Sequence, residues 1–363
     1  MKELHTFGWY AARISPLLPK EAFKPVPSRL LGGLAYLVVT LSAIIVIGVT
    51  DLPFWLNTML AIVIGSGFAG MSFLGHEILH GTVVRNPILK DFFGGMAFWS
   101  FCIGPKLWRK WHNLTHHVHT QHRDKDPDTW SHADSIQESP LKRLFFVLPK
   151  FVRNTIYFFF LMINFTFHST NMFFKFIKEF NPKKQPVVTL EFLLPTISWI
   201  GLLLAIGFEK WIFAYIIPML IANFILSSYI ATNHNLNPQT DINDPLANSL
   251  SVTVPKFIDV LHFNFSYHTE HHIFPGMNPK FYPMVKKKIL EMWPERYHEM
   301  PMEKAMIALF ITPRVYYTKE ELIDMQLGDV YDSLGTGLDP NHIISKRKED
   351  LTEVSINKEV SKN

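Results

Sequence analysis

The 363-residue sequence predicts an all-α polytopic membrane protein, with four transmembrane helices in two hairpins and a helical cap on the cytoplasmic side. Four charge-free runs are long enough to cross a bilayer core, which takes about 20 mostly apolar residues. Charged residues make up 18% of the chain, compared with about 25% in soluble domains. The 31 Phe and 9 Trp residues exclude a disordered or low-complexity chain, because such a composition buries or embeds itself.

The two hairpins are predicted from pairs of apolar runs with very short connections. Residues 30–50 and 52–75 contain no charged residue and are separated only by Asp51. Residues 192–208 and 211–233 are likewise free of charge and are separated by one acidic and one basic residue. Because each connection is so short, the two helices of a pair must run antiparallel and cross the membrane as a unit.

Two further apolar runs do not read as simple spans. Residues 92–105 are only 14 in number, which is short for a crossing and fits a re-entrant or interfacial segment. Residues 154–174 are numerous enough, but they include several polar side chains, among them Asn164 and His168. We interpret this second run as an interfacial helix, since a crossing would place the histidine-rich segments before and after it on opposite sides of the membrane.

The distribution of basic residues predicts which side of the membrane each segment faces. Of the 35 Lys and Arg residues, 5 precede Leu30, 15 lie in residues 81–190 and 14 follow His234. Only Lys210 falls in a loop assigned to the far side. The positive-inside rule therefore places both termini and all the histidine-rich segments in the cytoplasm. The first apolar run is too long for the core of a cleavable signal peptide.

The predicted domain organisation follows from these spans. Four segments are expected: a cytoplasmic N-terminal segment, a membrane domain, a cytoplasmic helical extension and a disordered charged tail, comprising residues 1–29, 30–290, 291–339 and 340–363. The basic residues are scattered along the chain, so membrane lipids are expected as partners and nucleic acid is not. A single cysteine, Cys102, excludes a disulfide framework and any cysteine-based metal site.

Histidine is the unusual chemical resource of this chain, and nine of the 17 histidines fall into four motifs. The motif G-H-E-I-L-H-G holds His76 and His80 at the end of the second apolar run. The motif T-N-H-N holds His234, just after the fourth run. The other two motifs, W-H-N-L-T-H-H and Y-H-T-E-H-H, hold His112, His116, His117, His268, His271 and His272.

The spacing within these motifs predicts a site for two metal ions. Residues four apart lie on one face of a helix, so the pairs 76/80, 112/116 and 268/272 can each direct two imidazoles to one place. The adjacent histidine of an H-H doublet projects about 100° away and can serve a second ion. Nine imidazoles are too many for one ion. Imidazole suits zinc, copper, iron and nickel, so ligand type alone does not select iron.

Two other classes of metalloprotein use similar residues. The stretch from His76 to His80 matches H-E-x-x-H, the zinc-protease motif whose Glu is the general base. Such a protease would leave most of the other motif histidines unexplained. A haem held by two histidines offers no reason for the H-H doublets. We therefore favour a two-metal centre and keep an intramembrane zinc protease as a distant alternative.

Over residues 60–283 the chain resembles the membrane-bound fatty acid desaturase family, within the superfamily that includes alkane and carotenoid hydroxylases. The resemblance rests on the ordered motifs H-x3-H, H-x3-H-H and H-x2-H-H, the D-P-D at residues 126–128 and the H-H-I-F-P at residues 271–275. The third motif begins with His268, where front-end desaturases often have Gln. The H-P-G-G motif of a fused cytochrome b5 is absent from the sequence.

The resemblance implies an oxygen-dependent fatty acyl desaturase with two iron ions, held by the eight histidines of the three boxes and by His234. It further implies an acyl lipid or acyl thioester substrate, dioxygen as co-substrate, and electrons from a separate ferredoxin, flavodoxin or cytochrome b5. A membrane di-iron hydroxylase of alkane, acyl or carotenoid substrates is the alternative, because H-E-I-L-H resembles the first box of alkane hydroxylases equally well.

No catalytic residue is expected beyond the metal ligands, but neighbouring polar groups should orient them. A ligating histidine usually donates its other N–H to a carboxylate, carbonyl or water, and the nearest carboxylates are those of Glu77, Asp126, Asp128 and Glu270. Asn233 could hold a water molecule beside the metals. The acyl chain is expected to pass along residues 92–105, with Trp108 and Trp111 at the edge of its channel.

Overall fold

The computed structural model describes residues 3–347, and these are mostly helical. Four helices are long and apolar enough to cross a membrane: α2 (Leu30–Val49), α3 (Phe54–His80), α11 (Gln185–Ile206), and the continuous α12 (Phe208–Trp211), η7 (Ile212–Ile216) and α13 (Ile217–His234). This confirms the predicted number of apolar spans. The inner pair, α3 and α13, is more buried than α2 and α11, and each inner helix ends on a motif histidine.

The first two helices pack closely, with a tyrosine ring of α2 against a glycine of α3. A Cβ on Gly70 of α3 would overlap the ring of Tyr36 on α2, so a small residue is required there, as is common between membrane helices. The helix α3 ends at Gly81, whose φ of 82° gives it the left-handed conformation typical of a helix C-terminus. The sequence G-H-E-I-L-H-G thus ends the helix immediately after His80.

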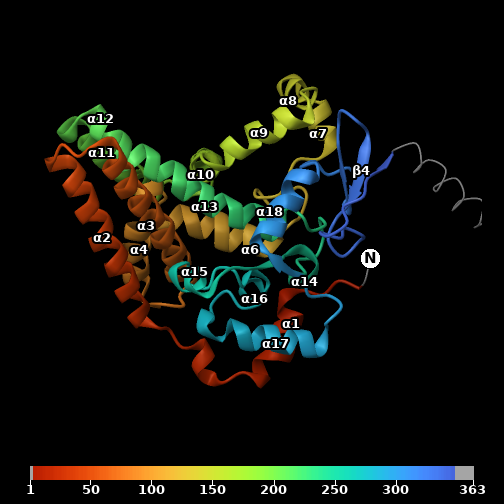
Figure 1. Cartoon of the computed structure of the whole chain (residues 1–363). Coiled ribbons are helices and arrows are strands. Elements are labelled where there is room, and N and C mark those ends of the chain that lie inside the picture. The colour runs from red at the N-terminus through yellow and green to blue at the C-terminus, as the bar shows by residue number, and fades with distance from the viewer. Residues whose placement is uncertain (1–2, 348–363) are drawn as a thin grey trace, which may run out of the picture.

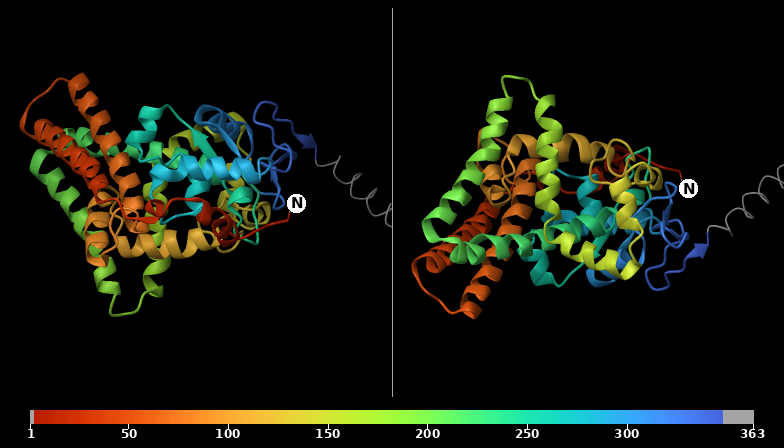
Figure 2. Two further views of the ribbon diagram at one scale, coloured as in Figure 1. Left: turned by 90° about the horizontal axis from the view of Figure 1, so that it is seen from below. Right: turned by 90° about the horizontal axis from the view of Figure 1, so that it is seen from above.

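The long helices gather at one end of the molecule with α4 beside them, and most of the shorter elements form the other end (Figures 1 and 2). The shorter helices include α1 (Phe7–Ile14), α4 (Pro87–Ala97), α5 (Pro105–Trp108), η5 (Arg109–His116), α6 (His117–His119), α7 (Ala133–Gln137), α14 (Pro245–Asn248), α15 (Lys256–Leu261), α16 (His268–Ile273), α17 (Tyr282–Met292) and α18 (Met302–Ile311). Residues 92–105 begin within α4 and continue through η4 (Trp99–Phe101), so they form two short helices and no span.

The prediction of a single helix over residues 154–174 is wrong. The chain forms α9 (Lys150–Leu161) and α10 (Asn164–Phe176), and α9 is itself bent by 114° from α8 (Pro140–Phe146). The break before α10 has a tertiary cause. The side-chain oxygen of Asn223 on α13 accepts a hydrogen bond from the backbone amide of Thr166 at 2.8 Å, and so satisfies one of the free amides of the first turn of α10.

The predicted helical extension over residues 291–339 is also only partly correct. After α18 the chain forms the strands β3 (Glu321–Ile323) and β4 (Asp329–Asp332), and β5 (Lys346–Arg347) completes an antiparallel sheet in the order β3-β4-β5. A separate parallel pair joins β1 (Ser251–Thr253) to β2 (Glu299–Pro301). Most of the predicted tail, residues 348–363, lies outside the described residues.

Candidate metal centre

The nine motif histidines converge from five elements at the junction of the long helices and the shorter ones. His76 and His80 lie in the last turns of α3, and His234 is the last residue of α13. Three more lie on η5 and α6, and three on α16. Eight of the nine are buried and His80 is partly buried. Burying polar rings is costly unless their nitrogens find partners, so each ring requires an account of both of its nitrogens.

The histidines form two neighbouring groups. In the first, one ring nitrogen from each of five histidines lies within 4.8 Å of the others: His76, His80, His112, His117 and His271. The second contains His116, His234 and His272. His268 joins this second group, because its Nε2 lies 2.7 Å from that of His234 and 3.1 Å from that of His272.

The two H-H doublets are each divided between the two groups. His117 belongs to the first group and His116 to the second, and His271 and His272 are divided in the same way. The pairs 76/80 and 268/272 stay together, as their spacing predicts. One metal ion in each group would therefore lie beside the other ion, joined by the short backbone of each doublet.

The expectation that His112 and His116 serve one ion is corrected by the backbone. Residues Arg109–His116 form a π-helix, in which residues five apart come into register. His112 consequently faces His117, with their Nε2 atoms 3.1 Å apart. A third possible group of His112, His116 and Asp128 is less suited to an ion of its own, because Asp128 already accepts hydrogen bonds from Trp111 and His168.

The donor set fits two metal ions. Within the groups the shortest Nε2 to Nε2 distances are 2.7 to 3.1 Å, close to the about 3.0–3.4 Å expected for nitrogens sharing one ion with bonds of about 2.1 Å. Both ring nitrogens of His76 and the Nε2 of His80 have no hydrogen-bond partner although they are buried. Unpartnered nitrogens that point together are the arrangement that a bound cation satisfies.

Three of the Nδ1 atoms contact groups that can accept a hydrogen bond, as expected of metal ligands, whereas those of His76, His117 and His268 have no hydrogen-bond partner among the described residues. That of His116 lies 3.0 Å from Asp126, that of His234 lies 3.1 Å from the carbonyl oxygen of Asn248, and that of His271 lies 3.1 Å from the Tyr282 hydroxyl. Asn248 and Tyr282 carry no sequence signal for this role, because only tertiary packing brings them to the histidines.

Three of the four predicted carboxylates reach the histidines. Besides Asp126, the carboxylate of Asp128 lies 3.4 Å from His116 and that of Glu77 lies 3.5 Å from His76. Burial lowers the pKa of His116, but Asp126 and Asp128 outweigh it and raise that pKa to about 9. The ring of His116 is therefore the one most strongly polarised by acidic neighbours.

Glu270 does not orient a histidine, contrary to the prediction. Its carboxylate accepts hydrogen bonds from Ser251 at 2.7 Å and Tyr297 at 2.6 Å. Burial raises the pKa of Glu270 to about 7. This carboxylate ties α16 to β1 and to the residues before β2. Asn233 is fully buried and neither atom of its side-chain amide has a partner, which agrees with a place beside a water molecule.

Histidines outside the motifs separate into two kinds. His168 on α10 lies 2.7 Å from Asp128, so it extends the polar chain that begins at His116. His262 contacts the Tyr229 hydroxyl at 3.0 Å and belongs to neither group. His119 and His122 also belong to neither group.

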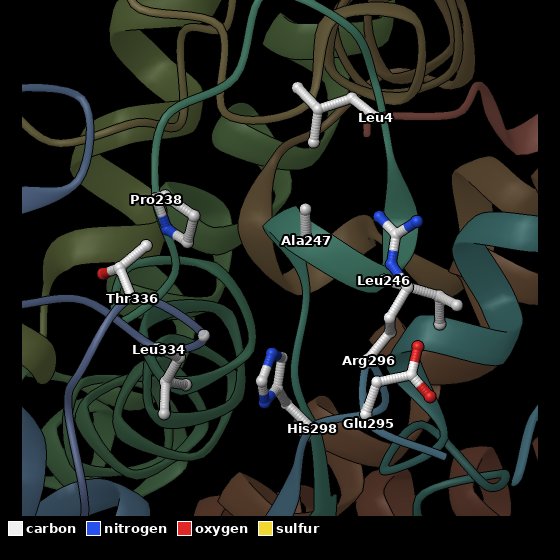
Figure 3. A pocket seen from close by; sticks show the side chains of 10 residues that line it. Leu4, Pro238, Leu246, Ala247, Glu295, Arg296, His298, Leu334 and Thr336 are labelled. Atoms are coloured by element: carbon white, nitrogen blue, oxygen red, sulfur yellow. The ribbon is translucent and has the colours of Figure 1, made fainter. Parts of the chain in front are cut away.

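An apolar cavity opens directly onto the histidines. Its walls include Phe73, Phe98, Trp108 and Phe165, and the rings of His76, His112, His116, His234 and His268 form its polar end. Trp108 and Trp111 both line it, as the sequence predicted. A second pocket, shown in Figure 3, contains none of the nine histidines, and its Arg296 is already paired with Asp244 at 2.7 Å.

The fold and the site define a class: a polytopic helical protein with a buried, histidine-only centre suited to two metals and facing an apolar cavity. The chain belongs to the fatty acid desaturase family, whose sequence model matches residues 53–304. It is therefore an oxidoreductase, and membership of this family overturns the zinc-protease interpretation of H-E-I-L-H.

Several desaturases are similar to the chain over most of its length. It is 25% identical to the sn-1 oleoyl-lipid 12-desaturase of Synechocystis sp., over 70% of this chain and 74% of that protein. It is 22% identical to the chloroplastic omega-6 fatty acid desaturase of Glycine max, over 85% and 73%. The identity to the Arabidopsis thaliana enzyme of the same name is 23%, over 85% and 69%.

Replacing Glu77 tests how far its carboxylate matters. We expect Glu77→Ala to lower metal affinity and turnover by about 10- to 100-fold, because it removes a carboxylate that lies 3.5 Å from Nδ1 of His76 without removing a ligand. Glu77→Gln keeps an acceptor oxygen and should lose less. Turnover and metal content are measured on the same preparations. Complete loss of turnover with full metal content would contradict this supporting role and indicate that Glu77 transfers protons.

Proposed function

We propose that the two histidine groups each hold one iron ion and that this centre serves the oxygen-dependent desaturation of a fatty acyl chain. The observation that carries the proposal is the pair of adjacent imidazole groups at the closed end of an apolar cavity. A methylene C–H bond offers no acidic or basic handle, so the oxidising power must come from a metal centre and dioxygen. One hydrogen leaves each of two neighbouring carbons and the double bond forms between them, while dioxygen takes up these two hydrogens together with two electrons from the carrier and two protons and leaves as two water molecules.

The protein's own residues hold the acyl chain and keep the site dry. Phe73, Phe98 and Trp108 would pack against the methylenes and exclude water, which favours the oxidation of the chain over side reactions. Asp126, Asn248 and Tyr282 would hold three imidazoles in one tautomer, with Nδ1 protonated and Nε2 free to bind a metal. Asn233 would hold a water molecule next to the second group.

The substrate is an acyl chain of a membrane lipid, with electrons supplied by a separate ferredoxin, flavodoxin or cytochrome b5. The similarity to a protein named as an oleoyl-lipid 12-desaturase supports a monounsaturated chain attached to a lipid as the substrate, in preference to an acyl thioester. The omega-6 desaturases among the relatives support the same substrate class.

Expression in a host that supplies a ferredoxin tests this function. We expect the total fatty acids to gain a diene in place of a monoene, detected by gas chromatography and mass spectrometry. Dissolved dioxygen should be required. A hydroxylated acyl chain would support the di-iron hydroxylase instead. A modified alkane or carotenoid with unchanged acyl chains would refute the acyl substrate.

We further propose that α2 with α3, and α11 with α13, form two transmembrane hairpins of a membrane domain over residues 30–290, with the histidine centre and both termini in the cytoplasm. The positive-inside distribution of Lys and Arg supports this orientation. Within it, the shorter helices around η5 and α16 form the cytoplasmic cap, residues 1–29 precede the membrane domain on the cytoplasmic side, and residues 291–363 follow it there.

Reporter fusions test the orientation independently of the chemistry. A reporter joined after Lys210 should behave as extracytoplasmic, and reporters joined after Pro186 or at the C-terminus as cytoplasmic. The expectation follows from the positive-inside rule, because Lys210 is the only basic residue in a loop assigned to the far side of the membrane. Alkaline phosphatase activity and fluorescence of a green fluorescent protein give opposite readouts at each site. An extracytoplasmic Pro186 reporter would mean that the α8–α10 region crosses the membrane, and the two-hairpin topology would then be wrong.

A further inference from the structure

Another cavity, distinct from the pocket of Figure 3, adjoins the cavity that faces the histidines. It has a volume of about 470 Å³ and lies between the helices α8 to α10 and the end of α13. Trp111, Asp128, Phe165 and Ile230 line both cavities. A chain entering the outer cavity would therefore meet the histidines by passing these four shared side chains. We call the outer cavity the vestibule.

The wall of the vestibule contains a cation with no anionic partner. Arg314 is partly buried, donates to the side-chain oxygen of Asn154 at 2.8 Å and to the carbonyl of Leu309 at 3.2 Å, and lies over the ring of Tyr157. Within residues 3–347 it forms no ion pair. Burial lowers the pKa of Arg314 to about 10, so the guanidinium is charged at neutral pH. A buried charge is costly unless it is paired.

A nearby arginine shows how the fold treats such a charge elsewhere. Arg153 lies on α9, one residue before Asn154, and is almost fully buried. Both of its contacts to the carboxylate of Asp324 are short, at 2.7 and 2.9 Å. Asp324 thus contacts Arg153 directly and acts on Arg314 only at longer range, so that no carboxylate among the described residues contacts the guanidinium of Arg314. Lys142, exposed on α8, also lines this cavity.

The helices α8 and α9, which line the vestibule, also carry a surface suited to contact with a membrane. Four large apolar side chains on or between α8 and α9 are more than 60% exposed: Leu141, Leu144, Val147 and Phe151. Basic residues alternate with them along the same two helices. Apolar side chains interleaved with Lys and Arg are typical of helices that lie in the lipid headgroup region. The same two helices line the vestibule through Lys142 and Phe145 on α8 and Tyr157 on α9.

We propose that the vestibule is the entrance for the acyl chain of an anionic membrane lipid, with its phosphate at Arg314 and Lys142 and its chain passing Trp111, Phe165 and Ile230 toward the histidines. This inference rests on the proposed desaturase function. It adds an entrance to the sequence-based expectation that the acyl chain passes along residues 92–105, none of which lines the vestibule. Arg314 is then a specificity-determining residue, because an uncharged lipid headgroup gains nothing from the unpaired guanidinium.

The test compares two lipids with the same acyl chains in nanodiscs. Full-length iron-loaded protein receives either dioleoyl phosphatidylglycerol, which is anionic, or the uncharged dioleoyl galactosyl diacylglycerol. Arg314→Gln should lower kcat/KM for phosphatidylglycerol by about tenfold or more, the loss of one charge-assisted contact, and leave that for the galactolipid nearly unchanged. Arg143→Gln removes an equal charge from α8 outside the vestibule and serves as the matched control.

A second variant guards against simple misfolding. Asn154→Asp places a carboxylate against the guanidinium and keeps its packing, so it should cause the same selective loss as Arg314→Gln, whereas Arg314→Lys should retain much of the preference. Equal behaviour of Arg314→Gln, Asn154→Asp and Arg143→Gln would overturn the proposal. An absence of turnover by the unmodified protein on either lipid would instead refute the desaturase function.

A binding measurement removes the dependence on turnover. Phosphatidylglycerol with a photoreactive diazirine on its acyl chain should attach to residues of α9, α10 or α13 that line the vestibule, and Arg314→Gln should reduce this labelling more than Arg143→Gln does. Peptide mass spectrometry locates the adducts. Labelling confined to the groove between α2, α3 and α11, which Leu37, Phe68 and Trp199 line, would place the entrance elsewhere and overturn the proposal.

Discussion

Alanine at any one of the nine motif histidines is expected to reduce fatty acyl desaturation to below detection. Each change removes one nitrogen from a centre that must bind its metals through several oxidation states, and the cavity left behind brings in no other donor. Because the doublets are divided, His117→Ala should remove iron from the first group and His116→Ala from the second. Fatty acid profiles report turnover, and iron analysis of the purified protein reports the loss of one metal.

Histidines away from the two groups provide the controls. His5 stacks on Trp9 with ring centres 3.8 Å apart, and His342 lies in the C-terminal region; alanine at either position should leave turnover and iron content close to those of the unmodified chain. Full activity of a motif variant would remove that histidine from the ligand set. Similar losses for His5→Ala and His342→Ala would indicate a general effect on folding in place of metal binding.

Removal of the metal is expected to abolish turnover completely and reversibly. Chelation under reducing conditions should strip both groups, and anaerobic addition of ferrous iron should restore activity. Zinc should occupy the same imidazoles without restoring it, because zinc binds these ligands but has no redox chemistry. Metal analysis before and after each step, together with Mössbauer spectroscopy of the iron-loaded protein, reports occupancy and the coupling of two non-haem irons.

His117→Ala is a matched control for this reconstitution, since iron should not restore its activity. Recovery of desaturation with zinc alone would contradict a mechanism that depends on a redox-active metal. One iron per chain at full activity would contradict the assignment of one ion to each histidine group.

Much of this protein is determined by local patterns in the sequence. The four apolar helices can be predicted from charge-free runs. Burying a charge in lipid is costly, so the absence of charged residues marks a spanning helix directly in the sequence. Two of the four histidine motifs stand at the ends of these helices: G-H-E-I-L-H-G, where Gly81 stops α3, and T-N-H-N, at the end of α13. The carboxylates of Glu77, Asp126 and Asp128 lie near their histidines because they are near them along the chain.

Only the tertiary structure decides how these parts are combined. The π-helix at Arg109–His116 brings His112 to His117, whereas the spacing alone indicates His116. The side chain of Asn223 on α13 accepts a hydrogen bond from the first turn of α10. The carboxylate of Glu270 accepts hydrogen bonds from Ser251 and Tyr297, although its neighbours in the sequence are motif histidines. For Asn223 and Glu270, a contact between residues distant in sequence supplies the hydrogen bond that outweighs a local preference of about 1 kcal/mol or less, and local patterns carry no record of such contacts.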